Sequence, residues 1–178
     1  MSFVYDPPAG PLAVLYRDDD LLVLDKPAGL LSVPGKAAEH RDCLENRARA
    51  AFPDTLLVHR LDMDTSGVMV FALNRAAQRH LGLQFERRHV RKTYLARVWG
   101  DVTGDSGTVD LPLKNDWPNR PRQTVSEDGR MARTDWRVIA REEEETRVEL
   151  TPLTGRSHQL RVHMAALGHP ILGDRFYA

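Results

Sequence analysis

The stretch from His59 to Gly67 sets nine mainly polar residues between two short apolar runs. Residues 56–58 precede it and residues 68–71 follow it, and both runs have the length of strands rather than of helices. A loop joined to strands on both sides is held at its two ends, which is how proteins commonly present reactive side chains. Since it carries a cation (Arg60), a carboxylate (Asp62) and a glycine suited to a turn (Gly67), we predict an active-site loop.

Short apolar runs separated by turn residues predict further strands. Residues 12–16 and 21–24 flank an acidic turn and indicate a hairpin. The other predicted strands are residues 94–99, 108–113, 131–140 and 146–150, whereas residues 114–130 look irregular and are rich in Pro and Arg.

Three segments have helical periodicity. Residues 42–52 end before Pro53, and residues 74–86 begin with Asn74 as a plausible N-cap. Residues 157–167 could be capped by Thr154 or Ser157 and end at Gly168, with Leu160, Met164 and Leu167 as the apolar anchors. Because the strands outnumber the helices and never settle into βαβ units, we expect an α+β fold with a mixed, mainly antiparallel sheet and flanking helices.

Bulk properties limit the class of protein. With 178 residues, 42% of them hydrophobic and 28% charged, the chain can form one globular domain or two small lobes. It has no apolar stretch long enough to cross a bilayer and no signal-like N-terminus, and a single cysteine (Cys43) allows no disulfide within the chain, so we expect a cytoplasmic protein.

The net charge of zero hides clusters of basic residues. These clusters could contact nucleic acid, or they could be solvated faces of ordinary type, and charge alone does not choose between the two. The basic residues concerned are Arg87, Arg88, Arg91, Lys92, Arg120, Arg122, Arg156 and Arg161, with His158 and His163 beside the last two.

Asp62 could be a nucleophile, a general base or an anchor for an arginine. A buried carboxylate stays ionised more easily beside a cation, and Arg161 is the best candidate because residues 154–163 form the other dense polar patch. The alternative for Arg161 is a structural salt bridge. On a helix His158 shares one side with Arg161, and Gln159 shares the adjoining side with His163.

Two other chemistries are less well supported. His158, His163 and His169 match no zinc spacing, so we expect satisfied or exposed histidines and no metal. The run Asp62-Met63-Asp64-Thr65 superficially resembles the aspartate loop of haloacid-dehalogenase-type phosphotransferases. That loop places its Thr or Val one position later and opens a doubly wound parallel sheet, which this order of elements does not suggest.

The string from Val58 to Gly67 resembles the signature of the RluA family of RNA pseudouridine synthases, His-Arg-Leu-Asp followed by Thr-Ser-Gly. Similar segments extend over nearly the whole chain: residues 26–29, 30–35, 92–96, 116–121, 154–163 and 168–178, including Gly173-Asp174. The resemblance implies a pseudouridine synthase catalytic domain over residues 1–178, without an N-terminal S4-type domain. It also implies action without a cofactor or metal, as a monomer and away from membranes, on 23S ribosomal RNA and on the anticodon stem-loop of transfer RNAs.

Carried over residue by residue, the resemblance implies that Asp62 is the catalytic aspartate, paired with Arg161. Tyr94 would stack on the target uracil, and Arg60 would fill the place of the flipped base. The basic residues at 87, 88, 91, 92, 120, 122 and 156, with His158, would then contact RNA.

In that family the chain continues past the Gly-Asp segment with strands that help line the uracil pocket, so we expect a C-terminally truncated domain. The alternative function is a catalytically incomplete RNA-binding module that acts as an RNA chaperone.

Overall fold

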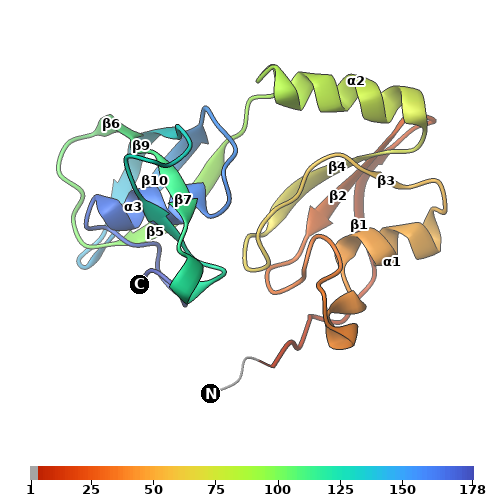
Figure 1. The fold of residues 1–178 in the computed structure, drawn as a ribbon, viewed down its shortest axis with the longest axis horizontal. Helices are drawn as coiled ribbons and strands as arrows, with labels where there is room; N and C mark the ends of the chain where they lie inside the picture. Colours follow the sequence, from red (N-terminus) through yellow and green to blue (C-terminus); the bar gives the residue numbers. More distant parts are fainter. Residues whose placement is uncertain (1–3) are drawn as a thin grey trace. The chain divides into compact units, whose positions relative to one another are not determined.

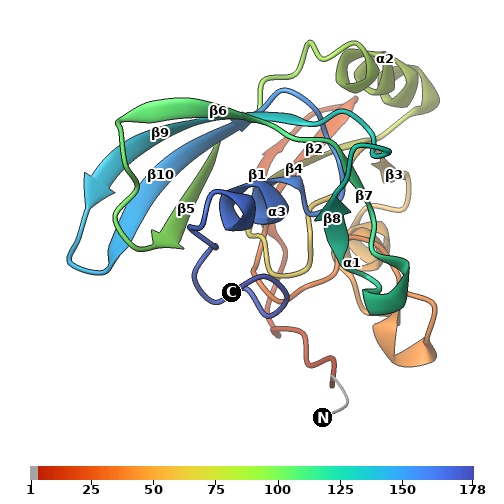
Figure 2. The same ribbon diagram turned by 60° about the vertical axis from the view of Figure 1, so that its left-hand side comes forward.

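The computed structural model describes residues 4–178, which fall into two compact units, one ending at His89 and one beginning at Val90 (Figures 1 and 2). Both units combine antiparallel sheets with helices, and residues 4–178 contain three α-helices. The predicted α+β class and antiparallel pairing are therefore confirmed. No helix among these residues is long and apolar enough to cross a membrane.

The first unit is a four-stranded antiparallel sheet in the order β1-β2-β4-β3. Its helices α1 and α2 lie on opposite sides of the strands in Figure 1, and α2 contacts β3 and β4. The element bounds are β1 Ala13–Arg17, β2 Leu21–Lys26, η1 Ala38–Arg41, α1 Leu44–Ala51, β3 Leu56–Leu57, β4 Gly67–Ala72 and α2 Arg75–Glu86.

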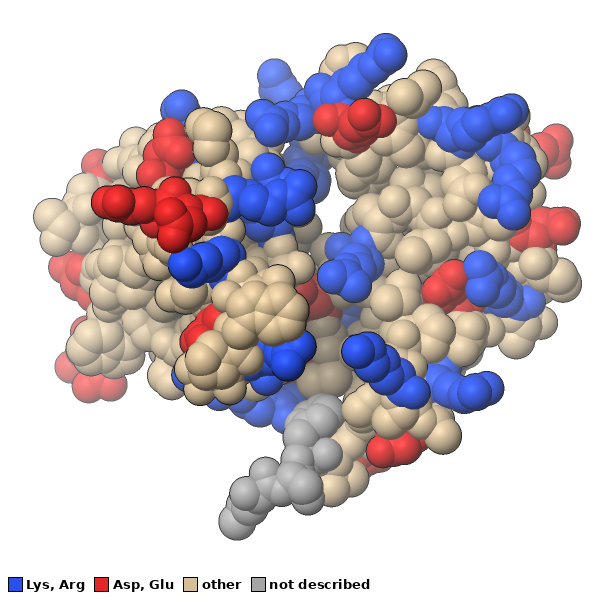
Figure 3. Space-filling view, viewed as in Figure 1, with Lys and Arg blue, Asp and Glu red and all other residues tan. Residues whose placement is uncertain are grey.

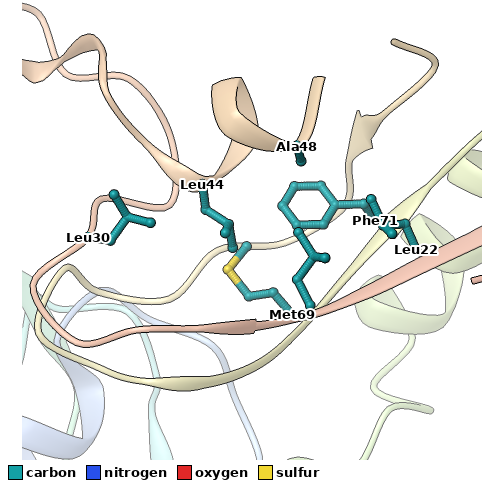
Figure 4. Packing of buried hydrophobic residues seen from close by; sticks show 7 residues of the cluster. Leu22, Leu30, Leu44, Ala48, Met69 and Phe71 are labelled. Carbon is teal, nitrogen blue, oxygen red and sulfur yellow. The ribbon is translucent and has the colours of Figure 1, made fainter. Parts of the chain in front are cut away.

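The core of this unit lies between the sheet and α1. Leu22 and Leu24 of β2 point to the same face as Met69 and Phe71 of β4, and the apolar side of α1 covers them (Figure 4). Because side chains alternate along a strand, Lys26 falls on that same buried face and is fully inaccessible to solvent.

The second unit is a four-stranded antiparallel sheet in the order β5-β10-β9-β6, with a separate two-stranded hairpin of β7 and β8. Helix α3 packs its buried Met164 into a core made by Val98, Val148 and Leu150. The element bounds are β5 Tyr94–Trp99, β6 Ser106–Asp110, β7 Leu113–Asn115, η2 Trp117–Asn119, β8 Gln123–Val125, β9 Arg133–Arg141, β10 Glu145–Pro152 and α3 Gln159–Ala166.

Most predicted elements are confirmed, including the first hairpin and the helix after Asn74, whose side chain accepts a hydrogen bond from the backbone N–H of Ala77 (2.9 Å). Two predictions about residues 108–130 were wrong. The predicted strand over 108–113 ends at Asp110, before Pro112, which has no N–H for a sheet ladder. The segment predicted to be irregular contains the β7–β8 hairpin.

The predicted cap and one predicted anchor of α3 were also wrong. Residue His158 occupies the N-cap position without a capping side-chain bond, and the hydroxyl of Thr154 bonds instead to the side chain of Gln159 (2.7 Å). Leu167 is 38% exposed, whereas Val162 and His163 are buried.

A buried polar network explains this choice of buried face. The Gln159 side-chain amide donates to the hydroxyl of Thr134 (3.0 Å), and that hydroxyl lies 2.9 Å from Nδ1 of His163. The other ring nitrogen, Nε2, lies 2.9 Å from the carbonyl oxygen of Leu111, so it carries a proton and donates. Because burial lowers the pKa of His163 below its ordinary value, the ring is neutral at pH 7. Gln159 and His163 share one side of the helix as predicted, and the prediction that His163 is a satisfied histidine is confirmed.

Acidification should destabilise the protein through His163. Burial lowers the pKa of His163 below its ordinary value. Between these two pKa values the unfolded chain binds more protons than the folded one, so the free energy of unfolding falls as pH drops below about 6.5. We expect His163→Asn to remove this part of the pH dependence in denaturant titrations between about pH 7.5 and 5.

The matched control is His169→Asn, because His169 also bonds to a backbone carbonyl, that of Trp99 (2.8 Å), but is only half-buried. A pH dependence equally steep in the wild type and in His163→Asn would contradict the assignment.

Candidate active site

The stretch predicted to be an active-site loop connects β3 and β4, so its predicted place between two strands is confirmed. Within it Asp62 is half-buried and Arg60 is exposed. The backbone N–H of Thr65 donates to the carbonyl oxygen of Asp62 (3.1 Å), which closes a turn. Gly67 was predicted to be a turn residue, but it lies outside this turn as the first residue of β4, with φ +120°, a conformation that favours glycine.

The loop is anchored by the segment from Lys26 to Ser32. The hydroxyl of Ser32 donates to the carbonyl oxygen of Leu61 (2.6 Å) and accepts from its N–H (3.0 Å). The carbonyl oxygen of Met63 accepts from the backbone N–H of Gly29 (2.9 Å) and from Nζ of Lys26 (2.8 Å). The residues on both sides of Asp62 are therefore fixed through their backbone groups.

The ammonium group of Lys26 donates hydrogen bonds to three backbone carbonyl oxygens. Besides Met63, its ammonium donates to the carbonyl oxygens of Pro27 (3.0 Å) and Leu30 (2.6 Å). Burial lowers the pKa of Lys26 to about 8, although the carboxylates of Asp64 and Asp62 act in the opposite direction. The ammonium thus joins two chain segments and places positive charge near the loop's carboxylates.

His59 connects the start of the loop to the rest of the first unit. Its Nε2 accepts a hydrogen bond from the backbone N–H of Val70 (3.0 Å), and its ring stacks on Phe85 of α2 with centroids 4.7 Å apart. An accepting nitrogen requires the neutral ring. His59 therefore positions the loop.

In the second unit, Arg161 of α3 forms an ion pair with Asp174. Its Nε and Nη2 donate to the two carboxylate oxygens at 2.6 and 2.8 Å, and the Asp174 side chain is only 3% exposed. The guanidinium also lies 5.3 Å from the ring centre of Phe176 and 5.1 Å from that of Tyr177. The salt bridge considered as an alternative for Arg161 thus exists.

Burial would raise the pKa of Asp174, but hydrogen bonds from Arg161 and from the backbone N–H of Phe176 outweigh it, and the net pKa lies below the ordinary value. The carboxylate is therefore ionised at neutral pH. It holds Arg161 in one orientation.

His158 has a left-handed backbone conformation, with φ 53°. Its Nδ1 lies 2.7 Å from the hydroxyl of Tyr177, and its ring stacks on Phe176. Since Arg161 lies over the same Phe176 ring, the prediction that His158 and Arg161 share one side of the helix is confirmed.

The predicted RNA-contacting cations lie mostly at the surface. Arg87 and Arg88 are exposed after α2, Arg91 is exposed before β5, and Arg120 is exposed at the tip of the β7–β8 hairpin. Arg122, Arg156 and Lys92 are half-buried. Figure 3 shows lysine and arginine side chains spread over the surface of both units, with acidic side chains among them.

The predicted site residues are divided between the two units. Arg60 and Asp62 share one loop of the first unit, whereas Tyr94 and Arg161 belong to the second. Tyr94 is half-buried at the start of β5, opposite Leu150. The pairing of Asp62 with Arg161 stays a prediction.

Sequence reasoning missed three positioning residues. Lys26 was interpreted as part of a turn because Pro27 follows it. Every second residue of a strand points to the same face, so its spacing from Leu22 and Leu24 could have indicated a buried lysine. Asp174 stood in a segment noted only for its resemblance to the family. Ser32 gave no local signal.

Comparisons with known proteins agree on one family. The model of the family described as RNA pseudouridylate synthase matches residues 20–166. The Dual-specificity RNA pseudouridine synthase RluA of Yersinia pestis is 57% identical over 94% of this chain and 82% of its own length. Its counterpart from Escherichia coli K12 is 56% identical over 98% of this chain and 81% of its own length.

Among solved structures, Human RNA Pseudouridylate Synthase Domain Containing 1 superimposes with a TM-score of 0.82 at 32% identity, covering 97% of this chain and 73% of that one. Human RNA Pseudouridylate Synthase Domain Containing 4 gives 0.76 at 31% identity, with 93% and 69% covered. The chain therefore belongs to the RNA pseudouridylate synthase family, a family of isomerases, and the resemblance seen in the sequence is confirmed.

Replacing Lys26 with Met should flatten the pH dependence of stability above neutrality. The pKa of Lys26 is about 8 in the folded protein against an ordinary 10.5. Between these values the unfolded chain binds more protons, so wild-type stability should rise with pH by up to about 1.4 kcal/mol per pH unit. Denaturant titrations across this window should show the rise in the wild type and in the exposed control Lys36→Met, but not in Lys26→Met.

Replacing Asp174 with Asn should lower the free energy of unfolding by about 3 kcal/mol, because it removes the buried carboxylate that pairs with the guanidinium of Arg161. The matched control is Asp101→Asn, since Asp101 pairs with Arg141 at 3.1 Å but is 75% exposed. That change should cost less than about 1 kcal/mol. Equal losses in the two variants would show that the Arg161 pair is no stronger than a surface pair.

Proposed function

We propose that this protein converts specific uridines to pseudouridine in structured RNA, with Asp62 as the catalytic residue. The observation that carries the proposal is the signature loop, in which the residues on both sides of Asp62 are fixed by Lys26, Gly29 and Ser32 while Arg60 remains exposed. The curated relatives are named dual-specificity RNA pseudouridine synthases. We therefore propose 23S ribosomal RNA and the anticodon stem-loop of transfer RNAs as substrates, in the cytoplasm.

The reaction is an isomerisation and consumes no co-reactant. The bond from ribose C1′ to uracil N1 breaks, the uracil turns, and C5 bonds to C1′. The proton on C5 is then lost and N1 gains one, so the atoms balance. Asp62 can attack C1′ or remove a sugar proton to give a glycal, and both routes require its ionised form.

Access to the target requires that the nucleotide leave the stack, at a cost of a few kcal/mol. Arg60 is exposed on the same loop as Asp62, and its planar guanidinium can stack and hydrogen-bond in the vacated place. Tyr94 offers the flipped uracil an aromatic face worth about 1–3 kcal/mol. Weakly paired loops are the favoured targets because extrusion costs least there.

Arg161 is proposed to stabilise the ionised Asp62. Asp174 engages Nε and Nη2 of Arg161, and the forked geometry of a guanidinium allows one arginine to pair with two carboxylates. In this proposal Asp174 acts by fixing the orientation of Arg161. The exposed cations Arg87, Arg88, Arg91 and Arg120 would contact phosphates, together with Lys92, Arg122, Arg156 and His158.

Replacing Asp62 with Asn should abolish catalysis and spare RNA binding. RNA carrying tritium at uracil C5 releases the label when C5 bonds to ribose, so tritium release measures the reaction directly. We expect at least about a hundredfold slower release in Asp62→Asn, since the amide is neither a base nor a nucleophile. RNA affinity should change by less than about threefold, because binding depends mainly on phosphate contacts.

Asp64→Asn is the matched control, since it makes the same charge change two residues away at an exposed position and should retain release. Unchanged release in Asp62→Asn would refute Asp62 as the catalyst. Absence of release from the wild type on both RNA classes, with RNA affinity retained, would favour the RNA-chaperone alternative.

A further inference from the structure

The second unit contains a polar pocket of about 360 Å³ that includes neither Tyr94 nor Arg161. Three segments form its wall: the base of the β7–β8 hairpin, the turn from Asp128 to Arg130, and the loop from Gly155 to Ser157. Such a hollow needs a polar or charged occupant, because its lining is made largely of polar groups.

The charges around the pocket are predominantly positive. Lys114, Arg130 and Arg156 line it from three different segments. The one acidic residue in the lining, Asp128, is 90% exposed and lies 3.7 Å from Lys114, at the long end of an ion-pair distance. Lys92 adds a fourth cation behind the loop, where its Nζ donates to the carbonyl oxygen of Thr154 (3.3 Å).

Some hydrogen-bond donors at the pocket have no acceptor among the described residues. Among residues 4–178, the side chain of Arg130 makes no ion pair or hydrogen bond, and the backbone N–H groups of Gly155 and Ser157 have no acceptor. Arg156 is held at the wall because its Nε donates to the carbonyl oxygen of Met131 (3.1 Å). Cations beside unpaired backbone N–H groups are the usual lining of a phosphate site.

The turn that carries Arg130 is rigid. The backbone N–H and carbonyl oxygen of Arg130 pair with those of Leu113, at 2.8 and 3.0 Å. A Cβ on Gly129 would lie 2.7 Å from backbone atoms of Leu113 and Ser126, so only glycine allows this close approach. The backbone that carries Arg130 is therefore fixed before any ligand arrives.

From this geometry we infer that the pocket binds a backbone phosphate of the substrate RNA, through Lys114 and Arg130 together with Arg156. The inference rests on the proposed function and extends it, because Lys114 and Arg130 were not among the predicted RNA contacts. The hairpin that forms one wall also carries Arg120 and Arg122 near its tip, so an RNA strand along the hairpin would meet several cations in succession. The role of this phosphate contact is to fix the position of the RNA along the protein, since a phosphate carries no sequence information.

The test compares a double variant, Lys114→Ala with Arg130→Ala, with the wild type. RNA affinity for an anticodon stem-loop is measured by fluorescence anisotropy over a series of salt concentrations. The plot of log affinity against log salt has a negative slope, and losing one phosphate contact should make it shallower by about 0.7–0.9. The RNA affinity near 0.1 M salt should then fall by about five- to eightfold. In tritium release KM should rise accordingly while kcat stays within about twofold.

The matched control removes two arginines from the solvent-facing side of the same unit's sheet, Arg97→Ala with Arg137→Ala. These arginines pair with Glu145 (2.6 Å) and Glu149 (3.0 Å), so the control makes the same change in net charge away from the pocket. Its salt slope should equal that of the wild type.

A double variant with the wild-type salt slope would overturn the pocket assignment, and so would a control variant that loses as much slope as the double variant. These outcomes are independent of the proposed function. A wild-type protein that releases no tritium would refute the function, while the slope comparison would still show whether the pocket holds a phosphate.

Discussion

The buried ammonium of Lys26 is the constraint around which the first unit is organised. Alternation along β2 turns this side chain to the same face as Leu22 and Leu24, where no water can solvate a charge. Three carbonyl oxygens must therefore converge on it, and they come from the turn after β2 and from the loop that contains Asp62. Because a buried charge must be hydrogen-bonded, the Lys26 ammonium joins the turn after β2 to the loop that contains Asp62. These hydrogen bonds hold the backbone of the candidate catalytic loop in place.

The sequence predicted the elements whose pattern is local. Strands β1, β2, β5, β9 and β10 show short apolar runs, and α2 shows both periodicity and the Asn74 cap, so residues near in sequence were sufficient. The β7–β8 hairpin was missed because each of its strands has only three residues. The cap of α3 was predicted wrongly because the hydroxyl of Thr154 bonds to Gln159, whose side-chain amide also donates to Arg133 and Thr134 of β9.

The candidate site also combines features that the local sequence predicts with features that depend on distant residues. The composition of the loop singled out Asp62 and Arg60, and helical spacing correctly placed His158 beside Arg161. The hydrogen bonds that position the site could not be predicted, because their two partners are far apart in the sequence. Lys26 bonds to Met63, Ser32 to Leu61 and Arg161 to Asp174. Chemistry at a site depends on residue type, which a sequence displays, whereas orientation depends on tertiary hydrogen bonds, which it does not.

The net charge of zero agrees with an RNA substrate once the pairing of the arginines is considered. On the solvent-facing side of the second unit's sheet, Arg97 and Arg137 are neutralised by glutamates. At the β7–β8 hairpin, Arg120 lies over the exposed ring of Trp117 and Arg122 lies near Phe176, contacts that leave the charge uncompensated. Glutamates thus neutralise arginines on one surface of this unit, whereas Arg120 and Arg122 keep their positive charge at the hairpin although the net charge of the chain is zero.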